Sequence, residues 1–297
     1  MIKLLLLSWC LTACSDYTLS DKEDPKEIED VEEIIDDTDD TNEPSVDTST
    51  IDTGDILIEE TAVVATCAVA PNPVTPPFTA ATFDGSGSYD SGGNVIAAYN
   101  WELIELPEGS AAILPYTSGM TIGGFYADLA GDYVAQLTVT NELGDTDICQ
   151  TTLEAIPAQS LWIEMFWQYA GDDMDLHLLA PGGTLETNSD CYYANCSWSG
   201  LDWGIASVTE DNPSLDIDDI SGTGPENINI YSPQIDGVYT VYVHDYPGSV
   251  YAGSNEVTIN IYLNGSIIWS ATKAITVEDS YTPYAIIDWA NQSVTPL

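Results

Sequence analysis

Two short segments in the C-terminal half of the chain concentrate carboxylate side chains, the protein ligands that Ca²⁺ prefers. In an extended strand, alternate side chains share a face, which places Asp173 beside Asp175. The same spacing places Asp216 beside Asp218. If the two segments are neighbours in space, their carboxylates converge on one calcium ion. The predicted ligands are Asp173, Asp175, Asp216, Asp218, Asp219 and Glu226.

The alternative is that these carboxylates are ordinary solvated groups of a chain that is acidic throughout. The 297 residues include 49 acidic ones against four lysines, arginine is absent, and the formal net charge is −45. Adaptation to a saline habitat would produce the same excess. A surface of this charge repels phosphate backbones and anionic lipid headgroups. The composition therefore excludes nucleic-acid binding and electrostatic docking on a membrane.

The two histidines of the chain, His177 and His244, lie in runs of residues that are typical of strands. A pair of strand histidines could bind a metal ion, and His244 with Asp245 could form a catalytic dyad. Adjacent strand residues face opposite sides, which excludes the dyad. We predict that both imidazoles pack in the core or at its rim. The sequence contains no GxSxG, HExxH, P-loop or Rossmann glycine pattern, so we predict that the protein is not an enzyme.

An aromatic loop bounded by two cysteines offers a second kind of site. The segment Cys191-Tyr-Tyr-Ala-Asn-Cys196 is followed closely by two tryptophans. Exposed aromatic side chains on a rigid loop give a large contact area with little loss of entropy, as glycan or peptide binding requires. The predicted ligand-binding residues are Tyr192, Tyr193, Trp198 and Trp203. The alternative is that these aromatic side chains cap the end of a sandwich.

The elements that position these residues are predicted to be strands. Several short runs alternate between apolar and polar residues or are rich in β-branched and aromatic ones, at 133–139, 162–167, 229–231, 239–243 and 257–263. Gly, Pro, Asn and Asp separate them, and no long amphipathic helical pattern is present. Many short strands are typical of sandwiches and barrels. We therefore predict an all-β protein with two tandem β-sandwiches.

The first folded segment, residues 61–157, resembles a PKD domain, an immunoglobulin-like sandwich of extracellular bacterial proteins. The resemblance rests on DGSGSYD and YNW within residues 84–101, and on GDY followed by LTVTNELG within residues 131–144. It implies that Trp101 lies between the two sheets and that residues 141–144 form a hairpin turn. It also implies a spacer or interaction module without catalytic residues.

The second folded segment, residues 158–297, resembles the sandwich domain of unknown function in YfaP-like bacterial surface proteins. The resemblance rests on DMDLHLLAPGG at 173–183, LDIDDISGTGPENI at 215–228 and GVYTVYVHDY at 237–246. The opening is also similar to bacterial pre-peptidase C-terminal domains, which are jelly rolls. These resemblances imply a jelly-roll-like sandwich, but they do not imply a particular function.

The chain begins MIKLLLLSWCLTAC, a lysine followed by a short apolar run. This run is shorter than the roughly 20 residues that span a bilayer and indicates an export signal. The last four residues resemble the lipobox of bacterial lipoproteins, which implies cleavage after residue 13 and acylation of Cys14. We therefore expect a membrane partner through a lipid anchor, in the bacterial cell envelope at the outer membrane or cell surface. The alternative is an ordinary signal peptide in which Cys14 is incidental.

Residues 14–60 are predicted to be a disordered acidic linker. Residues 16–60 hold 19 acidic residues and two lysines, with no aromatic residue after Tyr17. Such a segment buries too little apolar surface to offset the entropy of ordering, and its like charges extend it. A loose cation-buffering or partner-binding tail is the alternative.

Four cysteines remain once Cys10 leaves with the signal and Cys14 is acylated. An even number in an exported chain predicts two disulfides, for which three pairings are possible. The domain organisation favours one disulfide in the first sandwich and one in a single loop of the second. The predicted pairs are Cys67 with Cys149 and Cys191 with Cys196.

Together these features predict a non-catalytic envelope lipoprotein that binds a glycan or surface-protein ligand, with Ca²⁺ as its cofactor. One rival is a structural spacer without a ligand, and another is an accessory domain of an extracellular hydrolase system. An exposed aromatic loop is expected for the binding module, and a buried one for the spacer.

Overall fold

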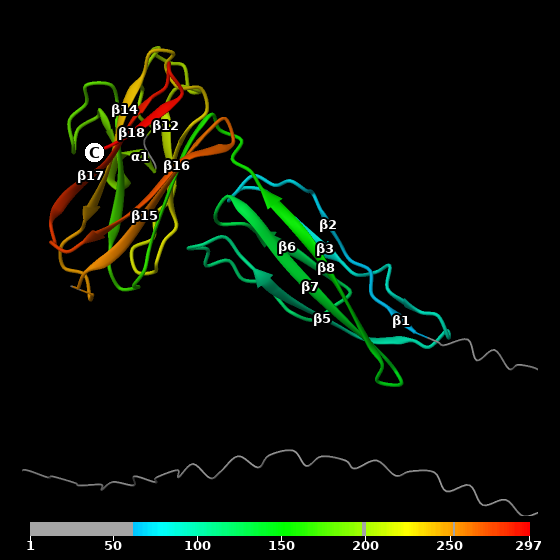
Figure 1. Cartoon of the computed structure of the whole chain (residues 1–297). Coiled ribbons are helices and arrows are strands. Elements are labelled where there is room, and N and C mark those ends of the chain that lie inside the picture. Colours follow the sequence, from blue (N-terminus) through cyan, green and yellow to red (C-terminus); the bar gives the residue numbers. More distant parts are fainter. Residues whose placement is uncertain (1–61, 198–199, 252) are drawn as a thin grey trace, which may run out of the picture. The chain divides into compact units, whose positions relative to one another are not determined.

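The structure of the protein is a computed structural model that describes residues 62–197, 200–251 and 253–297 (Figure 1). Nearly every regular element in these residues is a strand, and their only helix is the single turn α1 (Tyr193–Cys196). The predicted all-β fold is therefore confirmed. No helix in this part of the chain is long and apolar enough to cross a membrane. The predicted signal peptide (1–13), the lipidated Cys14 and the acidic linker (14–60) lie outside the described residues.

Strands β1 to β8 form two three-stranded antiparallel sheets and a short ribbon, in which β1 pairs with β4. The sheets have the orders β2-β3-β6 and β5-β7-β8. The bounds are β1 Val63–Val64, β2 Ala68–Ala70, β3 Ala80–Asp84, β4 Tyr89–Asp90, β5 Ile96–Glu105, β6 Thr121–Tyr126, β7 Gly131–Asn141 and β8 Thr146–Ala155. Both sheets contribute to one hydrophobic core, as in a sandwich. The expected burial of Trp101 in this core is confirmed, as is the turn at residues 141–144, which joins β7 to β8.

Both predicted disulfides are present. Cys67, directly before β2, is bonded to Cys149 in β8, and the bridge joins positions 82 residues apart. Cys191 is bonded to Cys196 across the turn that contains α1. The first bridge therefore ties the two ends of the first sandwich together, while the second staples one local loop.

Strands β9 to β18 form two five-stranded antiparallel sheets, with the orders β12-β13-β9-β15-β16 and β11-β10-β14-β17-β18. The bounds are β9 Leu161–Trp167, β10 Met174–Leu179, β11 Asp190–Cys191, β12 Pro213–Ile217, β13 Glu226–Ile230, β14 Val238–Asp245, β15 Asn255–Leu263, β16 Ser266–Ile275, β17 Ser280–Asp288 and β18 Ser293–Pro296. Figure 1 shows β15 beside β16, and these two strands continue one sheet from β9. Apolar side chains from both sheets form one continuous core.

This second core is separate from the first, so the described chain has the architecture of two sandwiches in sequence. The pattern of β14 shows how the sequence builds it, because Tyr239, Val241 and Val243 all face the core while the residues between them face outward. The boundary predicted between residues 157 and 158 stays a prediction.

Candidate metal centre

Asp175 and His177 lie on β10 and point away from the sandwich core. The residues between and beside them, Met174, Leu176 and Leu178, belong to the core, so the alternation of a strand turns the aspartate and the histidine to the other face. Both are nevertheless buried, with 3% of Asp175 and 1% of His177 exposed. The ring of Tyr192 stacks on His177 with the centroids 4.9 Å apart. The connection after β10 therefore folds back over this face and covers it.

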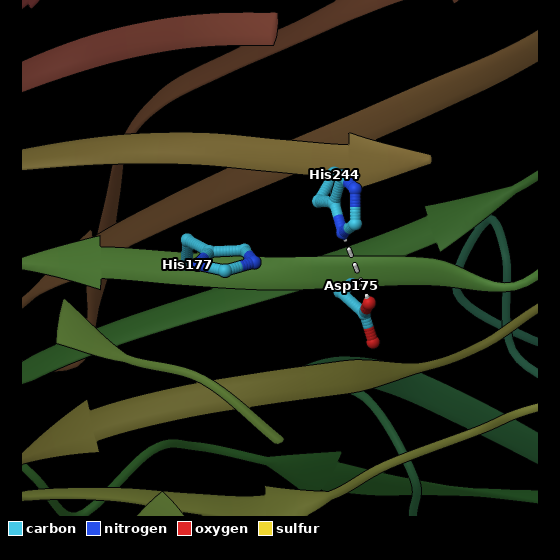
Figure 2. Close-up of side chains that lie close together, drawn as sticks. All are labelled: Asp175, His177 and His244. Atoms are coloured by element: carbon cyan, nitrogen blue, oxygen red, sulfur yellow. Dashed lines mark ion pairs between the residues drawn. The ribbon is translucent and has the colours of Figure 1, made fainter. Parts of the chain in front are cut away.

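His244, on the neighbouring strand β14, lies directly opposite Asp175 in the antiparallel pair. Its Nδ1 lies 3.4 Å from Asp175 Oδ2, and the two side chains form an ion pair when the imidazole is protonated (Figure 2). Its Nε2 is 3.4 Å from Oδ1 of Asp279, and the ring of Tyr281 stacks on it with centroids 4.2 Å apart. Ligand atoms of Asp175, His177 and His244 all lie within 4.8 Å of one another.

Two further carboxylates reach Asp175 from the opposite sheet. Strand β11 pairs with only the last two residues of β10, which leaves the Leu176 N–H without a strand partner on that edge. Glu226, the first residue of β13, fills the gap, because its Oε2 accepts a hydrogen bond of 2.8 Å from Leu176 N. Asp218 follows the end of β12. Asp175, Asp218 and Glu226 form a second group whose ligand atoms lie within 4.8 Å of one another.

A buried carboxylate behind His177 fixes the orientation of its ring. Asp190 is completely buried, and its Oδ2 lies 2.7 Å from His177 Nδ1 and accepts a second hydrogen bond from the backbone of Glu186. An Nδ1–H that donates to a carboxylate leaves the other ring nitrogen, Nε2, with a free lone pair. This nitrogen is therefore available as an acceptor or a metal ligand.

Four buried atoms of the two groups have no hydrogen-bond partner among the described residues, namely His177 Nε2, His244 Nδ1, Asp175 Oδ2 and Glu226 Oε1. Buried polar atoms are normally paired, so each of these requires an explanation. Lys273 is the only lysine in the described part of the chain, and it donates to the carbonyls of Pro283 and Leu297 instead. Apart from His177 and His244, no basic side chain of the described residues is placed to compensate the carboxylates.

Burial and mutual repulsion raise the pKa of these carboxyl groups. Burial, followed by the charge of Asp175, raises the pKa of Glu226 well above its ordinary value. The same two causes raise the pKa of Asp218, and they raise the pKa of Asp173 to about 7. Burial lowers the pKa of His244, but Asp175 and Asp279 raise it by more, so the net shift is upward. The site therefore favours bound cations, whether protons or metal ions, over full ionisation.

These shifts predict that the metal-free protein loses stability as the pH rises. The native state holds protons on Glu226 and Asp173 that the unfolded chain has already released above pH ~4, so unfolding becomes easier between pH ~4 and ~7. The raised pKa of His244 acts in the same direction at higher pH, because its stabilisation is lost only above the ordinary histidine pKa of 6.5. Thermal melts in the presence of a chelator should show a falling melting temperature across this range. Glu226→Gln should flatten the slope, and an unchanged slope would contradict the assignment.

Asp216, another predicted ligand, does not belong to either group of ligand atoms. Its carboxylate accepts hydrogen bonds from Ser214 Oγ and from the side-chain amides of Asn227 and Asn229. The predicted sharing of a face with Asp218 required a regular strand, but the pairing of β12 with β13 shifts register between Leu215 and Ile217. A bulge of this kind breaks the alternation of side chains, and it separates Asp216 from the other acidic residues.

The other predicted ligands lie in three different surroundings. Asp175, Asp218 and Glu226 come together as described above. Asp173 lies close enough for Asp175 and Asp218 to raise its pKa, and one of its carboxylate oxygens is buried without a hydrogen-bond partner among the described residues. Asp219 uses its carboxylate to accept hydrogen bonds from Gly222 N and Gly224 N, so it shapes the loop between β12 and β13.

The two histidines are the residues that sequence analysis underrated. Both are buried as predicted, but His177 Nε2 has no hydrogen-bond partner among the described residues and His244 Nδ1 faces Asp175 Oδ2 at 3.4 Å, which packing alone does not explain. The available signal was the spacing of Asp175 and His177, because residues two apart on a strand share a face. The cross-strand neighbour His244 could not be deduced without knowing the register of β10 and β14.

The expected exposure of the aromatic side chains is wrong at Trp203. This side chain is 6% exposed, packs against Tyr239 and donates from Nε1 to the carbonyl of Asn188. Tyr193 is partly buried against the core, and Tyr192 covers His177. The contact of Tyr192 with His177 of β10 places that side chain over the sheet, and the hydrogen bonds of Trp203 to Asn188 and Asn212 hold it inward. Trp198 lies outside the described residues.

No protein-family model matches the chain, and no curated protein matches it.

Proposed function

We propose that this chain is a non-catalytic binding module of the bacterial cell envelope, held by a lipid anchor at Cys14, whose second sandwich binds its ligand through a calcium ion. The anchor and the export signal are inferred from the N-terminal sequence. The cation is inferred from the group formed by Asp175, Asp218 and Glu226. The PKD-like first sandwich would serve as a spacer that carries this module.

The observation that carries the proposal is the unpartnered carboxylate oxygen of Glu226. It belongs to a side chain that is 1% exposed, and it lies in a group with the ligand atoms of Asp175 and Asp218. Carboxylates held close together repel one another unless a proton or a cation lies between them. Ca²⁺ suits such a group because it accepts several carboxylates and completes its shell with carbonyls or water.

A pocket beside these carboxylates offers room for a ligand. It has a volume of about 310 Å³, and its lining includes Asp173, Tyr246 and Ser249. The Tyr246 ring also contacts His244, and Asp173 interacts electrostatically with Asp175 and Asp218, so the pocket adjoins the centre. An oxygen-rich ligand such as a glycan could share the cation and lie against the tyrosine.

The rival function, a structural spacer without a ligand, is favoured by one observation. The aromatic side chain of Trp203 is buried, as that hypothesis expects. In that case the calcium ion would stabilise the loops between strands and nothing would bind above it. Glycan-array screening in calcium and in chelator separates the two functions. Calcium-dependent glycan binding supports the module, while stabilisation by calcium with no glycan or protein ligand supports the spacer.

Calcium is expected to bind the wild-type protein saturably and to raise its melting temperature. A free calcium concentration a hundredfold above Kd adds ~2.7 kcal/mol to the free energy of unfolding. For a protein of this size, this raises the melting temperature by roughly 5–10 °C. Glu226→Gln keeps an acceptor for Leu176 N but removes the charge, so calorimetric titration should show that calcium binding is lost. The matched control is Glu256→Gln, on the exposed face of β15. Wild-type protein that does not bind millimolar calcium contradicts the proposal.

A further inference from the structure

The imidazoles beside Asp175 point to a second kind of cation. We infer that His177, His244 and Asp175 form a three-ligand site for Zn²⁺, adjoining the carboxylate group and sharing Asp175 with it. The inference goes beyond the proposed calcium site, because it depends on the two ring nitrogens and not on Asp218 or Glu226. The fourth position of a tetrahedral ion would remain open to water or to a ligand.

The donor set selects the metal. Hard ions such as Ca²⁺ take oxygen ligands, whereas imidazole nitrogen with carboxylate oxygen is a common ligand set for Zn²⁺. In Figure 2, Asp175 and His177 project from one strand and His244 projects from its neighbour, which gives three donors from two hydrogen-bonded strands. Such a frame holds ligands more rigidly than a loop does.

The spacing of the donors is close to that of a bound ion. Their ligand atoms lie within 4.8 Å of one another. Donors of a tetrahedral zinc ion with bonds of ~2.0–2.1 Å are separated by ~3.4 Å. Binding would therefore draw the three side chains together slightly. Asp175 lies directly opposite His244 in the strand pair, and His177 lies two residues from Asp175 on the same strand, so all three side chains share one face of the sheet.

The strongest argument comes from Asp190 and His177. Metal-ligating histidines almost always donate their other ring N–H to a carboxylate or carbonyl, which fixes the tautomer and the ring orientation. Asp190 takes this position 2.7 Å from Nδ1, and the opposite nitrogen, Nε2, is buried without a partner among the described residues. A histidine that served only for packing would not leave this nitrogen unpaired beside an aspartate.

The surroundings hold the two rings in place. Tyr192 stacks on His177, Tyr281 stacks on His244, and the two imidazoles meet edge to face with centroids 5.9 Å apart. Tyr281 is itself fixed, because its hydroxyl donates to Glu186 Oε1 at 2.6 Å. The disulfide between Cys191 and Cys196 staples the segment that carries both Asp190 and Tyr192. The site is thus oriented by its neighbours before any ion binds.

The test uses the full chain without a polyhistidine tag. Because the sequence contains only two histidines, imidazole NMR reports on both ligands directly. Zn²⁺ added in the presence of saturating Ca²⁺ should shift the ring-nitrogen signals of His177 and His244 at one equivalent. Calorimetry should show that His177→Gln abolishes this binding and that Glu226→Gln retains it. The exposed Asp236→Asn is the matched control for loss of an acidic side chain.

Asp190→Asn provides a test that does not remove a ligand. Loss of an outer partner of this kind weakens metal affinity by roughly 10–100-fold, so Zn²⁺ should still bind, only more weakly, and Ca²⁺ should bind unchanged. Zinc that binds without shifting either imidazole and is lost in Glu226→Gln would overturn the inference but leave the calcium site standing. Absence of zinc binding with intact calcium binding would do the same. Absence of both would overturn both proposals.

Discussion

Asp175→Asn is expected to abolish the binding of both Ca²⁺ and Zn²⁺. Asp175 is the only residue common to the two groups of ligand atoms, so both lose a charged ligand in one substitution. The loss in each affinity should exceed the roughly 10–100-fold that removal of an outer partner costs. Calorimetric titration with each ion, in separate experiments, provides the measurement, with Asp236→Asn as the control.

The same substitution should also stabilise the metal-free protein at neutral pH. Asp175 contributes to the raised pKa of Glu226, Asp218 and Asp173, so its removal relieves repulsion among all three. We expect the melting temperature in chelator at pH ~7.5 to rise by a few degrees, at ~2–4 °C per kcal/mol. A variant that binds neither ion and melts at a higher temperature would show that repulsion among these carboxylates destabilises the metal-free protein and that Asp175 is needed for cation binding. Retention of both affinities would show that the two groups are not ligand sites.

The architecture was predictable because it depends on local patterns. The alternating or β-branched runs at 162–167, 239–243 and 257–263 became strands β9, β14 and β15. A strand with one buried face has this alternation in its own sequence, so it can be predicted without knowing which strands lie beside it. The disulfide pairs followed from the domain organisation for a similar reason, since each bridge closes within one sandwich.

The candidate site was predictable only in part, because it depends on register and on contacts between sheets. The sequence indicated Asp175, Asp218 and Glu226. The bulge between Leu215 and Ile217, which turns Asp216 away from them, cannot be recognised from the alternation of apolar and polar residues in the sequence. The role of Glu226 depends on a backbone N–H that β11 is too short to cover. Likewise, His244 meets Asp175 only through the register of β10 and β14.

The exposure of the aromatic loop could not be predicted from the sequence, for a different reason. Its composition is compatible with an exposed binding surface and with a lid over the sheet, and the two differ only in the direction in which the loop folds. The backbone N–H of Trp203 donates to Asn212 Oδ1 and its indole N–H donates to the carbonyl of Asn188, so this part of the loop folds inward. Tyr192 likewise folds inward and stacks on His177 at the candidate metal centre.

The largest loss of stability is expected from Cys67→Ala combined with Cys149→Ala. The bridge joins positions 82 residues apart, and closing a loop of that length restricts the unfolded chain by roughly 4 kcal/mol in the chain-entropy model. For a unit of about 100 residues this corresponds to a melting temperature lower by roughly 15–30 °C. Alanine replaces both half-buried sulfurs without adding a polar group to the core.

Comparison with the double variant Cys191→Ala, Cys196→Ala separates stability from metal binding. That bridge joins positions only five residues apart, so its removal should cost about half as much free energy. It fixes the segment of Asp190, however, and its loss should weaken Zn²⁺ binding, whereas loss of the Cys67–Cys149 bridge should leave both metal affinities unchanged below the new melting temperature. Calorimetric melts and titrations of the two variants provide both readouts. If removal of the Cys67–Cys149 bridge weakened metal binding as much as it weakened folding, the centre would depend on the first sandwich, and its assignment to the strands and loops from β10 to β14 alone would be wrong.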